Sequence, residues 1–171
     1  MHDQEVLPIR KYERFWTPYK PEDTLVHPWQ LYKVYPPTVC RALRIGEGTI
    51  IGAFCDIGAE VVIGRDCLIQ SSCKISNRTV LGDEVFLGPD VNILNDKYMD
   101  GRIQQVMVGS GCRIGGGVII LPGVTIGADV FICAGAMITK DVPPETRIIP
   151  RSVGDGTVGY GPGWYKSRVV W

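Results

Sequence analysis

The sequence has no excess of either charge and no long hydrophobic run. Eighteen Lys and Arg residues balance eighteen Asp and Glu residues, and no stretch concentrates either sign. A nucleic-acid partner is not expected, because binding to a phosphate backbone needs a basic face. The longest aliphatic run, Val118 to Leu121, is far too short to cross a bilayer, and the first thirty residues hold no run resembling a signal peptide. We therefore expect a cytoplasmic protein without a membrane partner.

Histidine is scarce, and the cysteines lack the spacing of metal ligands. The only two histidines are His2 and His27, and the six cysteines form no CxxC pair. No metal is therefore expected. Cys55 and Cys73 are eighteen residues apart, which makes a disulfide conceivable, although a cytoplasmic location argues against one. Packing in the core is the expected role of four of the six, which are Cys55, Cys67, Cys73 and Cys112.

An aliphatic residue recurs at every sixth position from Val39 to Ile93 and again from Val108 to Ile138. All sixteen of these positions hold Ile, Val or Leu, although those types account for only 46 of the 171 residues. The next residue is Gly in nine of the sixteen units. Two residues before each aliphatic, from Leu43 to Ala136, the residue is always Leu, Thr, Cys, Val or Ala. The chain is therefore a run of six-residue repeats.

This pattern predicts a stack of short strands joined by corners. Side chains alternate between the two faces of a strand, so the aliphatic and the residue two before it both point inward. A Gly after the aliphatic suits a sharp corner, where a positive φ is expected. An amphipathic helix is excluded, because positions six apart form no stripe on a helix with 3.6 residues per turn. Stacked units bury a core that no single unit could bury alone.

The repeats, and above all the run VIILPGVTIGADVFICAGAMITKDVPP, resemble the hexapeptide-repeat acyltransferases. The resemblance covers roughly residues 39–145. It implies an all-β fold, a left-handed parallel β-helix of about five turns with three units per turn, and a homotrimer. Residues 1–38 and 146–171 carry no repeat, and we expect an N-terminal capping segment and a C-terminal tail there.

Nine residues interrupt the repeat between Ile93 and Val108. They predict a loop at about 95–107, and a loop extruded from a regular coil usually carries function or an interface. A tolerated surface insertion is the alternative. The run LGPDVNILND before it resembles the segment that precedes the active-site loop of sugar-nucleotide amine N-acetyltransferases. On that resemblance, Asn95 and then Asp96 are the candidate catalytic residues.

Small residues should also stack in a column at one corner of the coil. With three units per turn, Gly88-Pro89, Gly115-Gly116 and Cys133-Ala134 fall on successive turns. In the family, the pantetheine arm of coenzyme A lies along such a wall between two subunits. The resemblance therefore implies acetyl-coenzyme A binding at Gly115, Gly116, Cys133 and Ala134, with the cations Lys140, Arg147 and Arg151 beyond them for the phosphates. Glycines that only serve corners, and solvated cations, are the alternative.

The repeats lack the histidine that many hexapeptide acyltransferases use as a general base. An amine that arrives unprotonated needs no such base, so the absence favours an amino group as the acceptor. The sequence thus predicts an acyl-coenzyme-A-dependent N-acyltransferase that acetylates a nucleotide-linked amino sugar. In that reaction Asn95 orients the amine, Asp96 assists proton removal, and the Gly116 amide donates to the oxyanion. A non-catalytic hexapeptide-repeat scaffold is the alternative.

Overall fold

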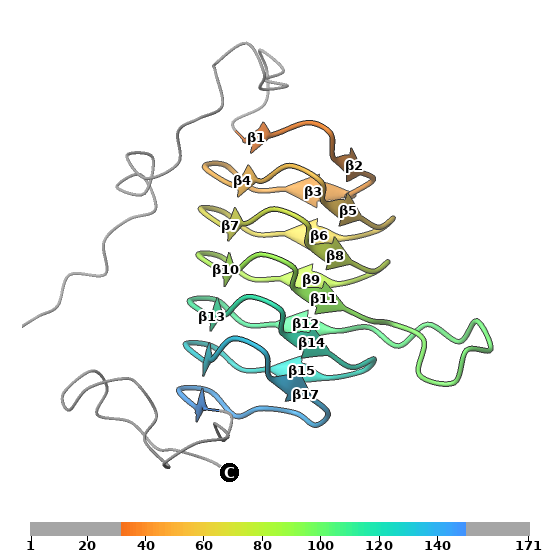
Figure 1. Cartoon of the computed structure of the whole chain (residues 1–171), viewed down its shortest axis with the longest axis vertical. Coiled ribbons are helices and arrows are strands. Elements are labelled where there is room, and N and C mark those ends of the chain that lie inside the picture. The colour runs from red at the N-terminus through yellow and green to blue at the C-terminus, as the bar shows by residue number, and fades with distance from the viewer. Residues whose placement is uncertain (1–31, 150–171) are drawn as a thin grey trace, which may run out of the picture.

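The computed structural model describes residues 32–149, which form a coil of short parallel strands with one loop extruded from its side (Figure 1). Every strand is two residues long and pairs with the strand above or below it, in three sheets. The seven-stranded sheet, sheet A, contains β1 (Lys33–Val34), β4 (Ile50–Ile51), β7 (Leu68–Ile69), β10 (Phe86–Leu87), β13 (Arg113–Ile114), β16 (Phe131–Ile132) and β18 (Arg147–Ile148). The six-stranded sheet, sheet B, contains β2 (Val39–Cys40), β5 (Asp56–Ile57), β8 (Lys74–Ile75), β11 (Asn92–Ile93), β14 (Ile119–Ile120) and β17 (Met137–Ile138). The five-stranded sheet, sheet C, contains β3 (Arg44–Ile45), β6 (Val62–Ile63), β9 (Val80–Leu81), β12 (Met107–Val108) and β15 (Thr125–Ile126).

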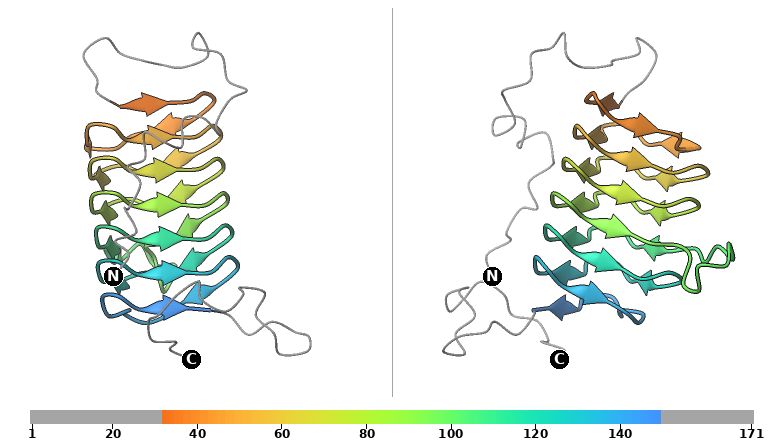
Figure 2. Two further views of the ribbon diagram at one scale, coloured as in Figure 1. Left: turned by 90° about the vertical axis from the view of Figure 1, so that its left-hand side faces the viewer. Right: turned by 45° about the vertical axis from the view of Figure 1, so that its right-hand side comes forward.

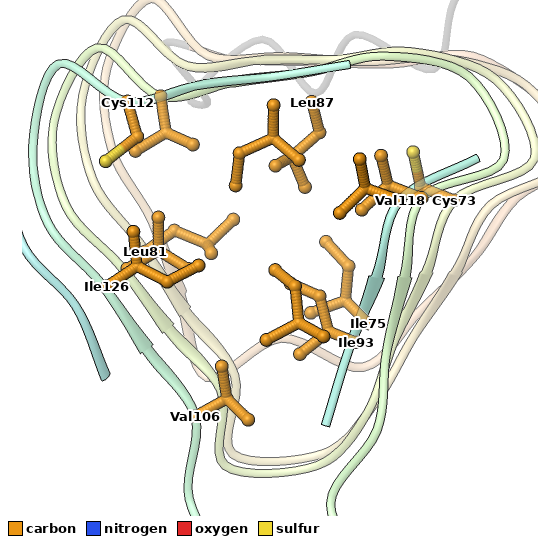
Figure 3. Packing of buried hydrophobic residues seen from close by; sticks show 14 of the residues in the cluster. Cys73, Ile75, Leu81, Leu87, Ile93, Val106, Cys112, Val118 and Ile126 are labelled. Atoms are coloured by element: carbon orange, nitrogen blue, oxygen red, sulfur yellow. The ribbon is translucent and has the colours of Figure 1, made fainter. Parts of the chain in front are cut away.

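The three sheets enclose one narrow apolar core. Ile57, Ile75 and Ile93 are Cα partners on successive turns of sheet B, and each is at most 1% exposed. Looking into the coil, Figure 3 shows Ile75 and Ile93 on one side and Leu81 and Ile126 on another. The predicted left-handed parallel β-helix is therefore confirmed, with about six turns instead of five.

The first turn departs from the predicted register. Cys40, and not Val39, is the Cα partner of Ile57, so the unit that leads to Ile45 is one residue short. Two expected inward side chains consequently point outward, with Val39 54% exposed and Leu43 73% exposed. Cys40 and Ala42 pack against the core in their place. The prediction for Val39 and Leu43 was wrong because Cys40 and Ala42, the residues that do face inward, are also apolar. The sequence therefore does not distinguish the two registers.

The coil extends beyond the predicted repeats at both ends. Strand β1, at Lys33–Val34, pairs with β4 and lies in the segment for which a cap was expected. At the other end, Val142 bridges to Ile126 and Ile148 pairs with Ile132, although the spacing from Ile138 to Val142 is not six residues. A unit that is not six residues long interrupts the period near each end. The period of six therefore predicts neither extension of the coil. The described coil, residues 32–149, contains no membrane-spanning helix.

The glycines that follow the buried aliphatics are required by close packing between turns and not by a positive φ. A Cβ on Gly64 would lie 2.4 Å from the backbone of Gly82 on the next turn, and one on Gly115 would lie 2.4 Å from the amide of Ala134. The positive φ values occur two residues later in the corner, for example at Asp66 and Gly117. The reason expected for this glycine was therefore wrong, although its place at the corner was right.

The cysteines fill the core as free thiols. Cys55, Cys67, Cys73 and Cys112 are each at most 3% exposed, as predicted, and all six cysteines are unpaired. Burial raises the pKa of Cys67 to about 11. A hydrogen bond to Cys55 and burial raise the pKa of Cys73, while the same hydrogen bond lowers the pKa of Cys55. Cys133, expected at a corner, follows β16 and is buried at 5% exposure.

Candidate functional site

The extruded loop leaves the coil after β11 and returns at β12, close to the predicted range of 95–107 (Figure 2). Its base is closed by a bridge between Asp96 and Ile103 and by the Gln104 amide, which donates to the Asn95 carbonyl at 2.7 Å. At the tip, the cations of Lys97 and Arg102 lie 5.6 and 5.5 Å from the ring centre of Tyr98. The loop is thus a folded projection, although it contains no helix.

Asp96 organises this loop. Its carboxylate accepts hydrogen bonds from three backbone amides, those of Tyr98 at 3.2 Å, Asp100 at 3.3 Å and Gly101 at 2.9 Å. An aspartate that satisfies the amides just after it in this way stabilises a turn without a helix. These contacts give Asp96 a structural role, and its proposed help in proton removal stays a prediction.

We expect Asp96→Ala to loosen the loop, because three amides lose their acceptor together. Limited proteolysis should cleave the variant within 97–102 at least about tenfold faster than the wild type, the factor that corresponds to one lost charge-assisted hydrogen bond. Asp96→Asn keeps one acceptor oxygen and should fall between the two. Equal cleavage rates for all three proteins would show that the carboxylate does not stabilise the loop.

A cleft of about 380 Å³ lies against sheet B beside the base of the loop. Its floor is formed by the outward face of strands β5, β8 and β11, and Leu94 and Ile103 add apolar contacts at the loop. The polar side chains that line it are Arg41, Asp56, Lys74, Ser76, Asn77, Asn92 and Asn95. The cleft therefore combines both signs of charge with several side-chain amides, a composition suited to a polar ligand.

Asn95 lines this cleft at the corner where the loop begins. Its Nδ2 donates to the Asn77 carbonyl at 3.2 Å. Asn77 is itself fixed, because its Oδ1 accepts from the Ala59 amide at 2.9 Å. With the Asn95 amino group engaged, its Oδ1 is left to accept a hydrogen bond from a ligand.

The predicted column of small residues stacks at the corner between sheets A and B. A Cβ on Gly88 would lie 2.5 Å from the Gly116 amide, and one on Gly115 would meet Ala134. The Gly117 amide donates to the Pro89 carbonyl at 2.8 Å, and the Gly135 amide donates to the Gly116 carbonyl at 2.9 Å. Among residues 32–149, no backbone carbonyl accepts from the Gly116 amide.

Two of the three predicted cations, Lys140 and Arg147, lie on different sides of the coil. Lys140 is exposed and follows β17 at the corner between sheets B and C, on the other edge of sheet B from Ala134. Arg147 begins β18 on sheet A, with its guanidinium 5.5 Å from the ring centre of Phe131. Arg151 lies outside the described residues, as do His2 and His27. In the described part of the chain, no group of three or more His, Cys, Asp or Glu side chains could hold a metal ion.

Sequence reasoning missed most of the lining of the cleft. Asp56, Lys74 and Asn92 are Cα partners on successive turns, and each stands one residue before a buried isoleucine. The spacing of eighteen residues that predicted the glycine column also predicts this polar ladder. The residue type at these outward positions changes from turn to turn, so the repeat pattern does not mark them.

Two segments of the chain, residues 43–77 and 105–140, match the family model of the bacterial transferase hexapeptide (six repeats). The predicted resemblance to hexapeptide-repeat acyltransferases is thereby confirmed for the coil on both sides of the loop. A Schizosaccharomyces pombe protein named as a putative acetyltransferase is 61% identical over 36 residues, which cover 21% of this chain and 17% of that protein.

Solved structures share the fold over a longer stretch. PerB from Caulobacter crescentus, solved in complex with CoA and GDP-perosamine, has 28% identity and a TM-score of 0.61 over 68% of this chain and 53% of its own. The acetyltransferase domain of PglB from Neisseria gonorrhoeae has 21% identity and a TM-score of 0.61 over 70% of this chain and 55% of its own, a likeness of fold alone. The chain thus spans about half the length of these two solved chains, and its match spans about a sixth of the S. pombe protein.

Proposed function

We propose that this chain is an acyl-coenzyme-A-dependent N-acyltransferase that acetylates the amino group of a nucleotide-linked amino sugar. The observation that carries the proposal is the cleft on sheet B with Asn95 at the base of the only loop extruded from residues 32–149. The 28% identity to PerB, which was solved with CoA and a nucleotide-linked amino sugar, supports the same reaction class. Location in the cytoplasm is part of the proposal.

The proposed reaction needs few groups from the protein. Acetyl-coenzyme A supplies a thioester, and the acceptor amine, arriving unprotonated, forms the new carbon–nitrogen bond as the carbon–sulfur bond breaks. The amine proton leaves with the thiolate, so no histidine is required. The Asn95 Oδ1 accepts a hydrogen bond from the amine and directs its lone pair at the thioester carbonyl. Gly116 and Asn95 lie at opposite edges of sheet B, so the amide that donates to the carbonyl oxygen, as negative charge develops there, is that of Gly116 of the partner subunit.

The proposal includes a homotrimer, because the cleft is open on its outer side and Pro89 and Ala134 of the small-residue column are exposed at the corner of the coil. A neighbouring copy that covers this corner would enclose a ligand between two subunits. Sedimentation at micromolar concentration should therefore show a trimer. A monomer under these conditions would contradict both the shared site and the enzyme.

Calorimetry with acetyl-coenzyme A is the direct test of the enzyme against the scaffold. An acetyltransferase should bind it with micromolar affinity and should release coenzyme A when sugar-nucleotide amines are added. A scaffold should bind neither substrate and should still assemble. Binding without transfer to any amine would leave the fold correct and the proposed reaction wrong.

Added bulk in the small-residue column should block acetyl-coenzyme A. Gly116→Val is the direct change, but a Cβ on Gly116 would lie 3.1 Å from the Pro89 carbonyl oxygen, so the variant also strains the coil. Ala134→Val is the cleaner variant, because Ala134 already carries a Cβ and is exposed. We expect it to weaken acetyl-coenzyme A binding at least about tenfold, which corresponds to 1.4 kcal/mol, with the melting temperature preserved.

Ala128→Val is the matched control for this experiment. Ala128 occupies the same position in its corner, two residues after a buried isoleucine, but lies between sheets C and A. Its substitution should leave acetyl-coenzyme A binding unchanged. Equal binding by the Ala134→Val and Ala128→Val variants would exclude the column as the binding wall.

A further inference from the structure

Lys74 lies in the middle of the cleft floor. Its strand, β8, stands between β5 and β11, and its Cα partners are Asp56 and Asn92. Within residues 32–149 its ammonium makes no hydrogen bond or ion pair. The position is exposed, so the charge is hydrated and available to a ligand.

The other charged groups of the cleft, and its side-chain amides, have partners. The Arg41 guanidinium is neutralised by Asp56, with 2.8 Å between Nη2 and Oδ1. Asn92 donates from Nδ2 to the Asp90 carbonyl at 2.8 Å, and Asn95 donates to Asn77. Lys74 is therefore the cation that the cleft offers to a ligand, and the amides beside it are neutral.

We propose that Lys74 binds the diphosphate of the acceptor substrate. The inference rests on the proposed function and names the group that the cleft recognises. A lysine binds phosphate as a flexible point charge, and a single ammonium among neutral amides favours an anion over a neutral ligand. Lys74 lies on β8, and Asn95 lies at the corner that follows the adjacent strand, β11. An acceptor with its amine at Asn95 and its phosphates at Lys74 would therefore span the spacing between two adjacent strands, about 4.8 Å, and the distance from the strand to the corner. That interval suits one sugar ring between an amine and a phosphate.

The ladder on sheet B agrees with this direction. On the three turns that lead to the loop, from β5 to β11, its outward residues are polar, namely Asp56, Lys74 and Asn92, whereas the outward residue of β2 is Val39. On the turns after the loop they are apolar, namely Ile119 and Met137. The charged part of the acceptor therefore belongs on the side of β5 and β8, and not on the side of β14 and β17. An acceptor without phosphate groups would leave the Lys74 ammonium without a binding partner.

Coenzyme A also carries a diphosphate, so the test must separate two sources of the same anion. Calorimetry on the full chain would measure UDP, GDP and dTDP in one series and acetyl-coenzyme A in another. We expect at least one nucleoside diphosphate to bind, and Lys74→Met to weaken it by about tenfold or more, as for a charged hydrogen bond. Lys74→Arg should stay within about threefold of the wild type, since the charge remains. Acetyl-coenzyme A should bind all three proteins equally.

Arg65→Met is the matched control. Arg65 is an exposed cation whose side chain is 69% exposed, and it pairs with Asp83 at the corner between sheets C and A, away from the cleft. The variant should bind every ligand like the wild type. If Lys74→Met proved unstable, Lys74→Gln would replace it and should show the same loss.

The remaining outcomes overturn the inference in distinguishable ways. Unchanged diphosphate binding by Lys74→Met would exclude Lys74 from the site. Parallel loss of acetyl-coenzyme A would assign Lys74 to that ligand instead. If the wild type bound acetyl-coenzyme A but no nucleoside diphosphate, the inference would fail while the proposed function survived. If it bound neither, both would fail.

Discussion

Ile75→Asp is expected to abolish folding of the coil. Ile75 is 1% exposed and stacks between Ile57 and Ile93, which have no exposed surface. The narrow core offers an aspartate no cation and no water, and an unpaired buried charge costs several kcal/mol in addition to the lost apolar packing. Because a folded domain is stable by only about 5–15 kcal/mol, this single change is enough to unfold it. Circular dichroism should show no strand signal and no cooperative thermal transition.

Two companion variants test the reason for this effect. Ile75→Val removes one methylene group and should cost only about 1 kcal/mol, with the transition retained. Met107→Asp places the same charge on an outward side chain that is 45% exposed, and the strand signal should survive. If Ile75→Asp folded as well as Met107→Asp, the inward stacking of the sixth residues would not be what stabilises the coil.

Asn95→Ala should reduce kcat about 10- to 100-fold, the scale of one lost orienting hydrogen bond near the reacting atoms. The side chain reaches the cleft with its amino group fixed by the Asn77 carbonyl, so the lost group is the Oδ1 that would accept from the substrate amine. Acetyl-coenzyme A binding should persist, because the small-residue column lies at a different corner of the coil. Single-turnover kinetics with saturating acceptor would measure the chemical step.

Replacing His2 and His27 together by Asn is the comparison for the Asn95 variant. Neither histidine belongs to the repeats, and the proposed reaction needs no general base. The double variant should stay within about threefold of the wild type in the chemical step, since no transition-state hydrogen bond is lost. His27→Asn alone could abolish turnover while assembly and coenzyme A binding stay intact. That result would identify a general base in the N-terminal segment and refute the role given to Asn95.

The glycine column was predicted from the same regularity as the core. Once turns of eighteen residues stack in register, the residues after Leu87, Ile114 and Ile132 must lie above one another, which the pairing confirms. The same register places Lys74 between Asp56 and Asn92. Asn95 was predicted from the resemblance of the run LGPDVNILND to the segment before an active-site loop, and the structure places it where the extruded loop begins.

The sequence by itself determined the parts of this protein that repeat. An aliphatic at every sixth residue can bury its side chain only if each turn pairs with the next, so the period specifies the strands, the core and the stacked columns. It did not determine the short first unit, where Val39 and Cys40 are both apolar and either could face inward.

Only the tertiary structure decided which polar groups have partners. Asp96 accepts three amides of its own loop, Arg41 is neutralised by Asp56, and Lys74 has no partner in the described coil. Such pairings depend on side-chain directions at corners and on the path of a loop that repeats nowhere else in the chain. The period of six predicts the features that all turns have in common. The cleft depends on the loop and on side chains that occur on single turns.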